Sequence, residues 1–210
     1  MSAPLWVLGD SWADPQSYTW AAASGWPSLL AARLGLGLVN SAVGGGGYCN
    51  GYSYPQQAAR GAGAGAGALL CWGGINDRGW PVEEVYQGAR TTYGLLRRLC
   101  PSAPLLVVGP EWGADERPAV LLERIAAVRR AAAEVGAQFV DSSDWLLGRF
   151  DLMLDAIHPT PEGHRLVAEA LAPELLWLLA TAPGPSRPGE LEAGGWPAPY
   201  AAEEPFVAAG

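Results

Sequence analysis

The sequence predicts a three-layer α/β/α domain around a parallel sheet of five strands. Five short apolar runs have strand length, and continuous apolar runs are typical of parallel strands that are covered on both faces. Between them lie segments whose apolar residues recur at three- and four-residue steps. Strands that alternate with helices form βαβ units, whose right-handed crossovers place helices on both faces of one sheet. The 210 residues are enough to bury a sizeable core in a single domain.

The predicted elements follow in order along the chain. The strands are Leu5–Leu8, 36–39, Ala68–Trp72, Leu105–Val108 and Gln138–Val140, and the helices are Val82–Leu99, 117–135 and 161–179. At the start of the last helix, Thr160 can serve as the N-cap and Pro161 can occupy the first helical position. The predicted domain spans residues 1–181. Residues 182–210 are rich in proline, glycine and acidic residues, and we expect either a disordered tail or a strap across the domain.

The composition excludes several functions. The formal net charge is −8 and every basic residue is arginine, which argues against nucleic acid and anionic membrane surfaces as partners. No apolar stretch approaches the roughly 18 residues of a membrane span, and no segment has the features of a signal peptide. We therefore expect a cytoplasmic protein, with a secreted mature form left open. The three cysteines and two histidines lack metal-like spacing, so neither a metal nor a cofactor is expected. The oligomeric state stays open.

The first strand runs into Gly9, Asp10 and Ser11. These residue types favour an ordinary turn, but the carboxyl ends of parallel strands are also where such folds bind ligands. Ser11 is therefore a candidate nucleophile. A candidate base lies in "DAIHP", where Asp155 precedes His158 by three residues. A turn there can fold the carboxylate onto Nδ1 and leave Nε2 to face a serine, although a solvated turn is the alternative.

Two glycine-rich stretches, 39–51 and 71–79, follow the second and third predicted strands. Backbone N–H groups in glycine turns can point at an anion. Asn76 adds an amide donor that suits an oxyanion. Two ordinary turns are the alternative interpretation.

Four of these motifs occur together. They are "GDSW", the glycine turn at 40–45, "GGIND" and "DAIHP", in this order and at three strand ends plus a late loop. Together they resemble the SGNH hydrolase family, also called GDSL esterases and lipases, over residues 5–179. The resemblance implies the flavodoxin-like α/β/α fold of that family and a serine esterase that forms an acyl-enzyme. The "GxSxG" elbow of the larger α/β-hydrolases does not occur in the chain.

The resemblance also implies a role for each matched residue. Ser11 is the nucleophile, His158 is the general base and then the general acid, and Asp155 holds the histidine in the required tautomer. Where the family often has leucine after the serine, this chain has Trp12. This departure concerns the shape of the acyl pocket and leaves the chemistry intact.

The oxyanion donors that the resemblance implies are the backbone N–H groups of Ser11 and Gly45 and the side chain of Asn76. Four consecutive glycines allow the register to slip, so Gly44 or Gly46 could serve in place of Gly45.

Several aromatic residues lie near the motifs. The candidate substrate-binding residues are Trp12, Trp72, Trp80, Trp112, Trp145 and Arg78. Aromatic rings at the sheet edge could stack a sugar or line an acyl pocket, with core packing as the alternative. Arg78 could recognise a carboxylate or phosphate, or form a structural ion pair. The segment 47–61 is a candidate lid or binding wall, or a plain surface loop.

The leading function is hydrolysis of a short acyl ester, for example an O-acetyl group on a sugar or small metabolite. An acyltransferase that passes the acyl group to an alcohol or amine is the first alternative. A non-catalytic glycan-binding module with a tryptophan rim is the second, although a binder needs no set of Ser11, Asn76, Asp155 and His158. A nucleotide-binding protein is least favoured, because the chain has no lysine for a phosphate loop.

Overall fold

The computed structural model describes residues 3–17, 22–113 and 115–181, which form an α/β fold around one parallel sheet. The five strands are β1 (Leu5–Leu8), β2 (Leu38–Asn40), β3 (Ala68–Trp72), β4 (Leu105–Val108) and β5 (Gln138–Val140). Their order across the sheet is β2-β1-β3-β4-β5, and every neighbouring pair is parallel. The winding reverses between β1 and β3, which is the place where ligands bind in such sheets.

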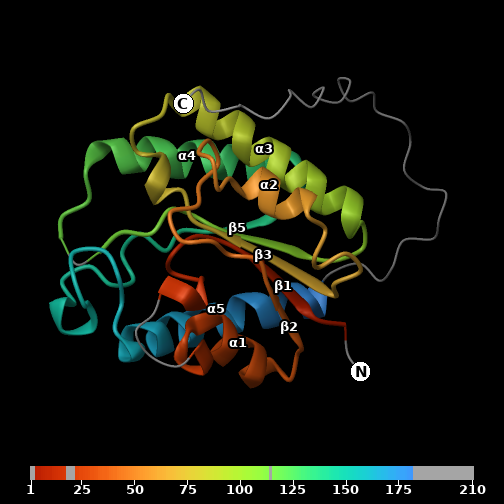
Figure 1. The fold of residues 1–210 in the computed structure, drawn as a ribbon, viewed down its shortest axis with the longest axis horizontal. Helices are drawn as coiled ribbons and strands as arrows, with labels where there is room; N and C mark the ends of the chain where they lie inside the picture. The colour runs from red at the N-terminus through yellow and green to blue at the C-terminus, as the bar shows by residue number, and fades with distance from the viewer. Residues whose placement is uncertain (1–2, 18–21, 114, 182–210) are drawn as a thin grey trace, which may run out of the picture.

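The helices cover both faces of this sheet. They are α1 (Trp26–Leu34), α2 (Tyr54–Ala59), α3 (Val82–Leu99), α4 (Ala119–Glu134) and α5 (Pro161–Thr181), with short 3-10 turns η1 (Pro15–Ser17), η2 (Ala22–Ser24), η3 (Ile75–Asp77) and η4 (Phe150–Leu152). Figure 1 shows α2, α3 and α4 on one face and α1 and α5 on the other. Each face has its own cluster of buried apolar side chains. The predicted three-layer architecture is confirmed.

Burial explains why the strands lack strict alternation of apolar and polar residues. Every residue of β1, β3 and β4 is buried, because these central strands have helices on both sides. The edge strands β2 and β5 are only half-buried. The charged residues of α3 also complement the helix dipole. Glu83 and Glu84 lie in its first turn, near the positive end, and Arg97 and Arg98 lie in its last turn, near the negative end.

Element boundaries differ from the prediction at several points. The second strand is Leu38–Asn40 instead of 36–39, because the Leu36 N–H donates to the Ala31 carbonyl and so closes the end of α1. The helix predicted at 117–135 is Ala119–Glu134, and the last helix runs on to Thr181. The sequence analysis identified neither α1 nor α2.

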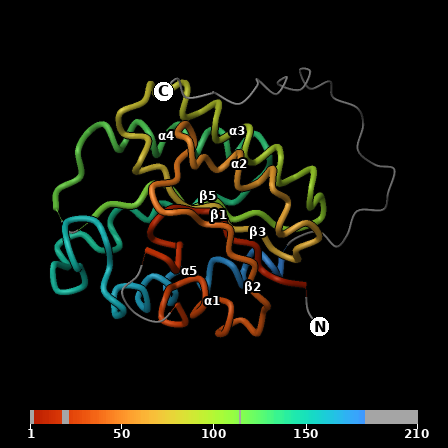
Figure 2. The backbone as a smooth tube through the Cα atoms, in the orientation of Figure 1, coloured from red at the N-terminus to blue at the C-terminus, as the bar shows by residue number. Residues whose placement is uncertain are grey.

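The loops that follow β4 and β5 lie on the same side of the sheet (Figure 2). They approach so closely that a Cβ added at Gly113 would clash with the Ala156 carbonyl oxygen. The second loop carries Asp155 and His158, so the first one helps to place them at the carboxyl edge. The predicted tail, 182–210, lies outside the described residues. In the part of the chain that the structure describes, no helix is long and apolar enough to span a membrane.

Candidate active site

Ser11 lies in a tight turn directly after β1. The Asp10 carbonyl accepts hydrogen bonds from the N–H groups of Ala13 and Asp14, and the Asp10 carboxylate accepts one from the Trp12 N–H at 3.0 Å. From the other side, Gln57 of α2 bonds both the N–H and the carbonyl of Gly9. The backbone on either side of Ser11 is therefore fixed, while the Ser11 side chain stays half-buried at the edge of the sheet.

The structure brings Ser11, His158 and Asp155 together, although 147 residues of chain separate the first two. Ser11 Oγ lies 3.0 Å from His158 Nε2, and His158 Nδ1 lies 2.9 Å from Asp155 Oδ2. An ionised carboxylate can only accept, so Nδ1 carries a proton and Nε2 is left to accept from the serine hydroxyl. This arrangement can activate a serine for nucleophilic attack.

The carboxylate of Asp155 is held in its ionised form. Its Oδ1 accepts the backbone N–H groups of Ile157 and His158, both at 2.7 Å, in addition to the ring contact through Oδ2. Partial burial works against ionisation, but the bonds from His158 and Ile157 outweigh it and lower the pKa of Asp155 to about 2. The same bonds form the turn that the three-residue spacing predicts.

The three predicted oxyanion donors lie in the segments that follow β1, β2 and β3. Among the described residues, no acceptor reaches the backbone N–H of Ser11 or that of Gly45. In contrast, the Gly44 N–H donates to Asp14 at 2.8 Å and the Gly46 N–H donates to the Val43 carbonyl at 2.9 Å. Gly45 has a φ of +75° and an exposed backbone, a conformation that favours glycine.

Asn76 of η3 supplies the third donor group. Its Nδ2 donates to the Gly46 carbonyl at 2.8 Å, and a longer bond of 3.4 Å runs to Asp10 Oδ2. The shorter bond ties the turn after β3 to the glycine turn after β2. The two bonds occupy both amide hydrogens, and an anion that binds nearby would replace Asp10 as the acceptor of the longer, weaker one.

Two buried acids hold these turns in place through hydrogen bonds. Asp77 is fully buried and accepts the backbone N–H groups of Tyr48 and Cys49 at 2.8 and 3.0 Å. Asp10 accepts the Tyr54 hydroxyl at 3.1 Å as well as the Trp12 N–H. Burial raises the pKa of Asp77, while its two backbone donors oppose that shift. Both acids therefore support the loops through hydrogen bonds.

Sequence reasoning missed Glu111, a buried acid just after β4. The position gave a signal, because an acidic residue directly follows an apolar strand and the "GP" turn at 109–110. Lone acids at strand ends are also ordinary turn residues, so this signal is weak without the neighbouring strands.

The tryptophans divide into buried and exposed groups. Trp12 and Trp72 are only 3% and 2% exposed, and their ring centroids lie 5.5 Å apart. Trp72 also packs against Trp26 and the half-buried Trp145, at 5.0 and 5.7 Å. Trp12 and Trp72 therefore pack as core residues, and neither has an exposed ring face on which a sugar could stack. Trp112 is half-buried, and Trp80 is exposed.

The structure also shows the surroundings of Arg78 and of the segment 47–61. The Arg78 side chain is exposed and forms no ion pair with a described residue. Within 47–61, α2 buries Tyr54 against the sheet, while Tyr52 points outward with 63% of its surface exposed. This segment is thus partly a packed helix and partly an exposed wall.

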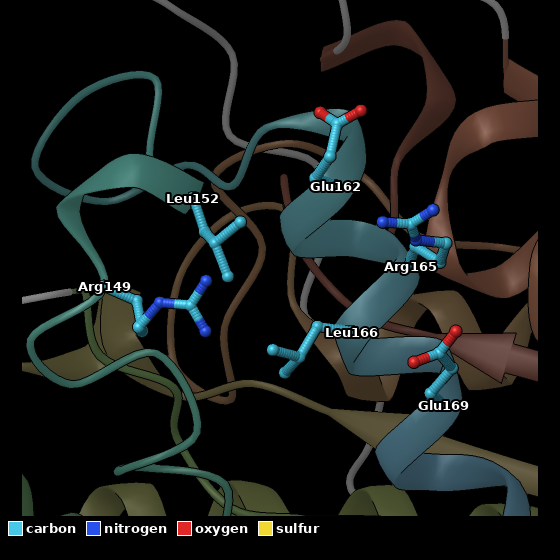
Figure 3. Close-up of a pocket in the computed structure, with 6 residues that line it drawn as sticks. All are labelled: Arg149, Leu152, Glu162, Arg165, Leu166 and Glu169. Carbon is cyan, nitrogen blue, oxygen red and sulfur yellow. The ribbon is translucent and has the colours of Figure 1, made fainter.

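A hollow of about 200 Å³ lies between η4 and α5 (Figure 3). Its lining residues are Arg149, Leu152, Glu162, Arg165, Leu166 and Glu169. They include neither Ser11 nor His158, and Asp151 already engages the Arg149 guanidinium. Within the described ranges, no group of three or more His, Cys, Asp or Glu residues could hold a metal ion.

The sequence also matches a known protein family. Residues 7–166 match the GDSL-like lipase/acylhydrolase family, a span that includes Ser11, Asn76 and His158. The chain belongs to this family. A GDSL-family member is a carboxylic-ester hydrolase, and the family resemblance that the four motifs indicate is confirmed.

One relative in sequence and two solved structures of similar fold accompany this family match. A GDSL lipase from Mycobacterium tuberculosis is 29% identical over 186 residues, covering 81% of this chain and 80% of that protein. A carbohydrate acetylesterase from Sinorhizobium meliloti has a similar fold, with a TM-score of 0.67 at 16% identity over 84% of this chain and all of that one. A salicylyl-acyltransferase from a tetracycline biosynthetic pathway has a TM-score of 0.67 at 17% identity, over 87% of this chain and 56% of the other.

Proposed function

We propose that the protein is a serine esterase that hydrolyses a short acyl ester, such as an O-acetyl group on a sugar or small metabolite. The observation that carries this proposal is the contact of His158 Nε2 with Ser11 Oγ at 3.0 Å, with Asp155 2.9 Å from Nδ1. This geometry supports Ser11 as nucleophile, His158 as base and Asp155 as the group that orients the imidazole.

The reaction divides into acylation and deacylation. Ser11 Oγ attacks the ester carbonyl carbon while its proton passes to His158 Nε2, and the carbonyl oxygen becomes an oxyanion. His158 then gives that proton to the leaving alcohol oxygen, which leaves an ester on Ser11. Water attacks this ester, again losing a proton to His158, and the acid is released as Ser11 regains its proton.

The oxyanion is held by the backbone N–H groups of Ser11 and Gly45 and by the Asn76 amide. Both backbone groups lack an acceptor among the described residues, whereas the Gly44 and Gly46 N–H groups are occupied. This difference favours Gly45 as the donor from the glycine turn. Donors that are already oriented toward a developing charge stabilise the transition state without reorganisation.

The preference for a short acyl group follows from the packing behind Ser11. The next side chain, Trp12, is buried against Trp72, and this close packing beside Ser11 favours a small acyl group over a long chain. The acetylesterase activity named for the S. meliloti protein is consistent with this preference. Trp80, which is 39% exposed, is a residue on which a sugar ring could stack.

Acyl transfer is the second candidate function. The fold that the chain shares with a salicylyl-acyltransferase favours it, since an alcohol or amine in place of water would use the same residues. Product analysis in the presence of excess acceptor distinguishes the transferase from the esterase. A transferase forms the acylated acceptor, and an esterase releases free acid.

The test of the proposal is hydrolysis of p-nitrophenyl esters from acetate to decanoate by the wild type and by Ser11→Ala. We expect the wild-type rate to fall with chain length, and Ser11→Ala to lose about 10³- to 10⁶-fold in kcat with its melting temperature retained. Wild-type rates that increase toward decanoate would overturn the proposed preference for a short acyl group. A Ser11→Ala variant with more than roughly a tenth of wild-type activity would overturn the nucleophile.

A further inference from the structure

Glu111 is a fully buried carboxyl group that the proposed reaction does not use. It follows β4 in the loop toward Gly113, and none of its surface is exposed. No N–H or O–H group of another described residue reaches either of its carboxyl oxygens. An ionised carboxylate in such a place would have only its own backbone N–H as a donor and no water, which is costly.

The neighbour of Glu111 is a second buried carboxyl group, that of Asp10. The two side chains are within hydrogen-bonding reach of each other, although they follow β4 and β1, with β3 between them in the sheet. Asp10 already has three donors: Oδ1 accepts the Trp12 N–H, and Oδ2 accepts the Tyr54 hydroxyl and the Asn76 amide. The charge of the pair therefore belongs on Asp10.

The turn after β3 leaves room for this pair. Gly73 and Gly74 have φ values of +141° and +122°, a region that favours glycine. A Cβ at position 73 would lie 2.8 Å from Asp10 Oδ2, and one at position 74 would lie 2.9 Å from the Pro110 ring. Two residues without side chains thus allow the acids that follow β1 and β4 to meet beyond the end of β3.

We propose that Glu111 is a positioning residue, whose protonated carboxyl donates a hydrogen bond to Asp10 and so fixes the turn of Ser11 and the amide of Asn76. The inference rests on the proposed function, because it assigns to Ser11 and Asn76 the roles given above. No proton leaves Glu111 during the reaction. The single proton shared by the two acids stays on Glu111.

The electrostatics of the pair agree with this placement of the proton. Burial raises the pKa of Glu111 well above its usual range, and the charge of Asp10 raises it further. Burial also raises the pKa of Asp10, but the bonds from Trp12, Glu111 and Tyr54 favour its ionised form. If the proton lay on Asp10 instead, one of its oxygens would turn from acceptor to donor and would compete with Tyr54 or Asn76.

The test compares Glu111→Gln with Glu111→Leu. The amide of Gln can donate to Asp10 as the protonated acid does, whereas Leu has similar bulk and no donor. With p-nitrophenyl acetate we expect Glu111→Gln to stay within about threefold of wild type in kcat, and Glu111→Leu to lose roughly ten- to a hundredfold with KM changed less than about threefold. Glu111→Met, also without a donor, replaces Leu if that variant does not fold.

Two further readouts separate positioning from a purely structural role. Infrared difference spectra between the wild type and Glu111→Gln should contain the C=O band of a protonated carboxylic acid at neutral pH. The loss in the double variant Glu111→Leu with Asn76→Ala should be smaller than the product of the single losses, because both changes act through one amide. Absence of that band, equal losses for Gln and Leu, or a Leu variant within twofold of wild-type kcat would overturn the role of Glu111.

Labelling with an alkyl phosphonate p-nitrophenyl ester keeps this result apart from the proposed function. Mass spectrometry should place the phosphonyl group on Ser11 in the wild type and both variants, more slowly in Glu111→Leu. A wild type that is not labelled on Ser11 would overturn the nucleophile and the inference with it. Labelling of Ser11 at equal rates in all three proteins would overturn only the positioning role.

Discussion

The contacts that would activate Ser11 come from outside its own turn. His158 reaches it from the loop before α5, and Asn76 reaches the adjacent glycine turn from the end of β3. Each contribution is thus a single side chain on a separate segment. Substitution of one residue at a time should therefore remove one function and leave the fold intact.

Asn76→Ala tests the side-chain donor to the oxyanion. Loss of one such donor is typically worth about 3 kcal/mol, so we expect kcat to fall on the order of a hundredfold or more, with KM little changed. Asn76 also holds the Gly46 carbonyl, so the melting temperature is measured in parallel. Gln87→Ala serves as the control, since among the described residues that amide bonds only Glu83, on the exposed face of α3. Equal kcat values for the two variants would contradict the oxyanion role.

Asp155→Asn tests the carboxylate behind His158. The amide keeps an oxygen for the Ile157 and His158 N–H groups, but it cannot stabilise the imidazolium as an ionised carboxylate does. We expect kcat to fall by about 10²- to 10⁴-fold, measured with p-nitrophenyl acetate, while the fold is retained. Activity close to wild type would mean that His158 acts without Asp155.

At the scale of elements, the apolar pattern predicted the strands that are buried on both faces of the sheet. The central strands β1, β3 and β4 match the prediction residue for residue, because helices cover them on both faces and no polar residue interrupts them. The shift of β2 follows from Leu36, whose N–H closes α1, a bond that apolar pattern does not reveal. Helix α2 has six residues, too few to show a period.

The candidate site was predictable to a similar extent. Short motifs indicated Ser11 at a strand end and Asp155 and His158 in a late loop, because serine hydrolase chemistry demands those residue types. Glu111 was not predictable, since its meaning depends on the order of strands that brings it to Asp10. The burial of Trp72 was likewise a tertiary effect, because Trp12, Trp26 and Trp145 surround it.

The contact between the loops after β4 and β5 leads to a prediction for Gly113→Ala. The added Cβ would meet the Ala156 carbonyl oxygen and displace the loop that carries Asp155 and His158. Because small displacements of reacting groups cost up to about a hundredfold, we expect kcat to fall at least about tenfold. Gly51→Ala is the matched control, since its Cβ would meet no atom within 4 Å. If both variants keep wild-type kcat, the loop contact does not position His158.

At the scale of the whole molecule, His164 joins the two helices that cover one face of the sheet (Figure 1). It lies on α5 with 1% of its surface exposed, and its Nδ1 accepts the Trp26 N–H at the start of α1 at 3.3 Å. Burial, and to a lesser degree the charge of His158, lowers the pKa of His164 to about 4. The imidazole is therefore neutral in the folded protein at neutral pH, and its protonation opposes the packing of α1 on α5.

This burial predicts that the protein loses stability in mildly acidic solution. An unfolded histidine titrates near pH ~6.5, so between that pH and about 4 the unfolded chain binds a proton that folded His164 does not. The free energy of unfolding should thus be unaffected by His164 above pH ~6.5 and should fall by about 2 kcal/mol at pH ~5. His164→Asn keeps an acceptor for Trp26 without the titration. Urea unfolding across this range should show a steeper loss in wild type than in His164→Asn, and parallel curves would contradict a neutral, buried His164.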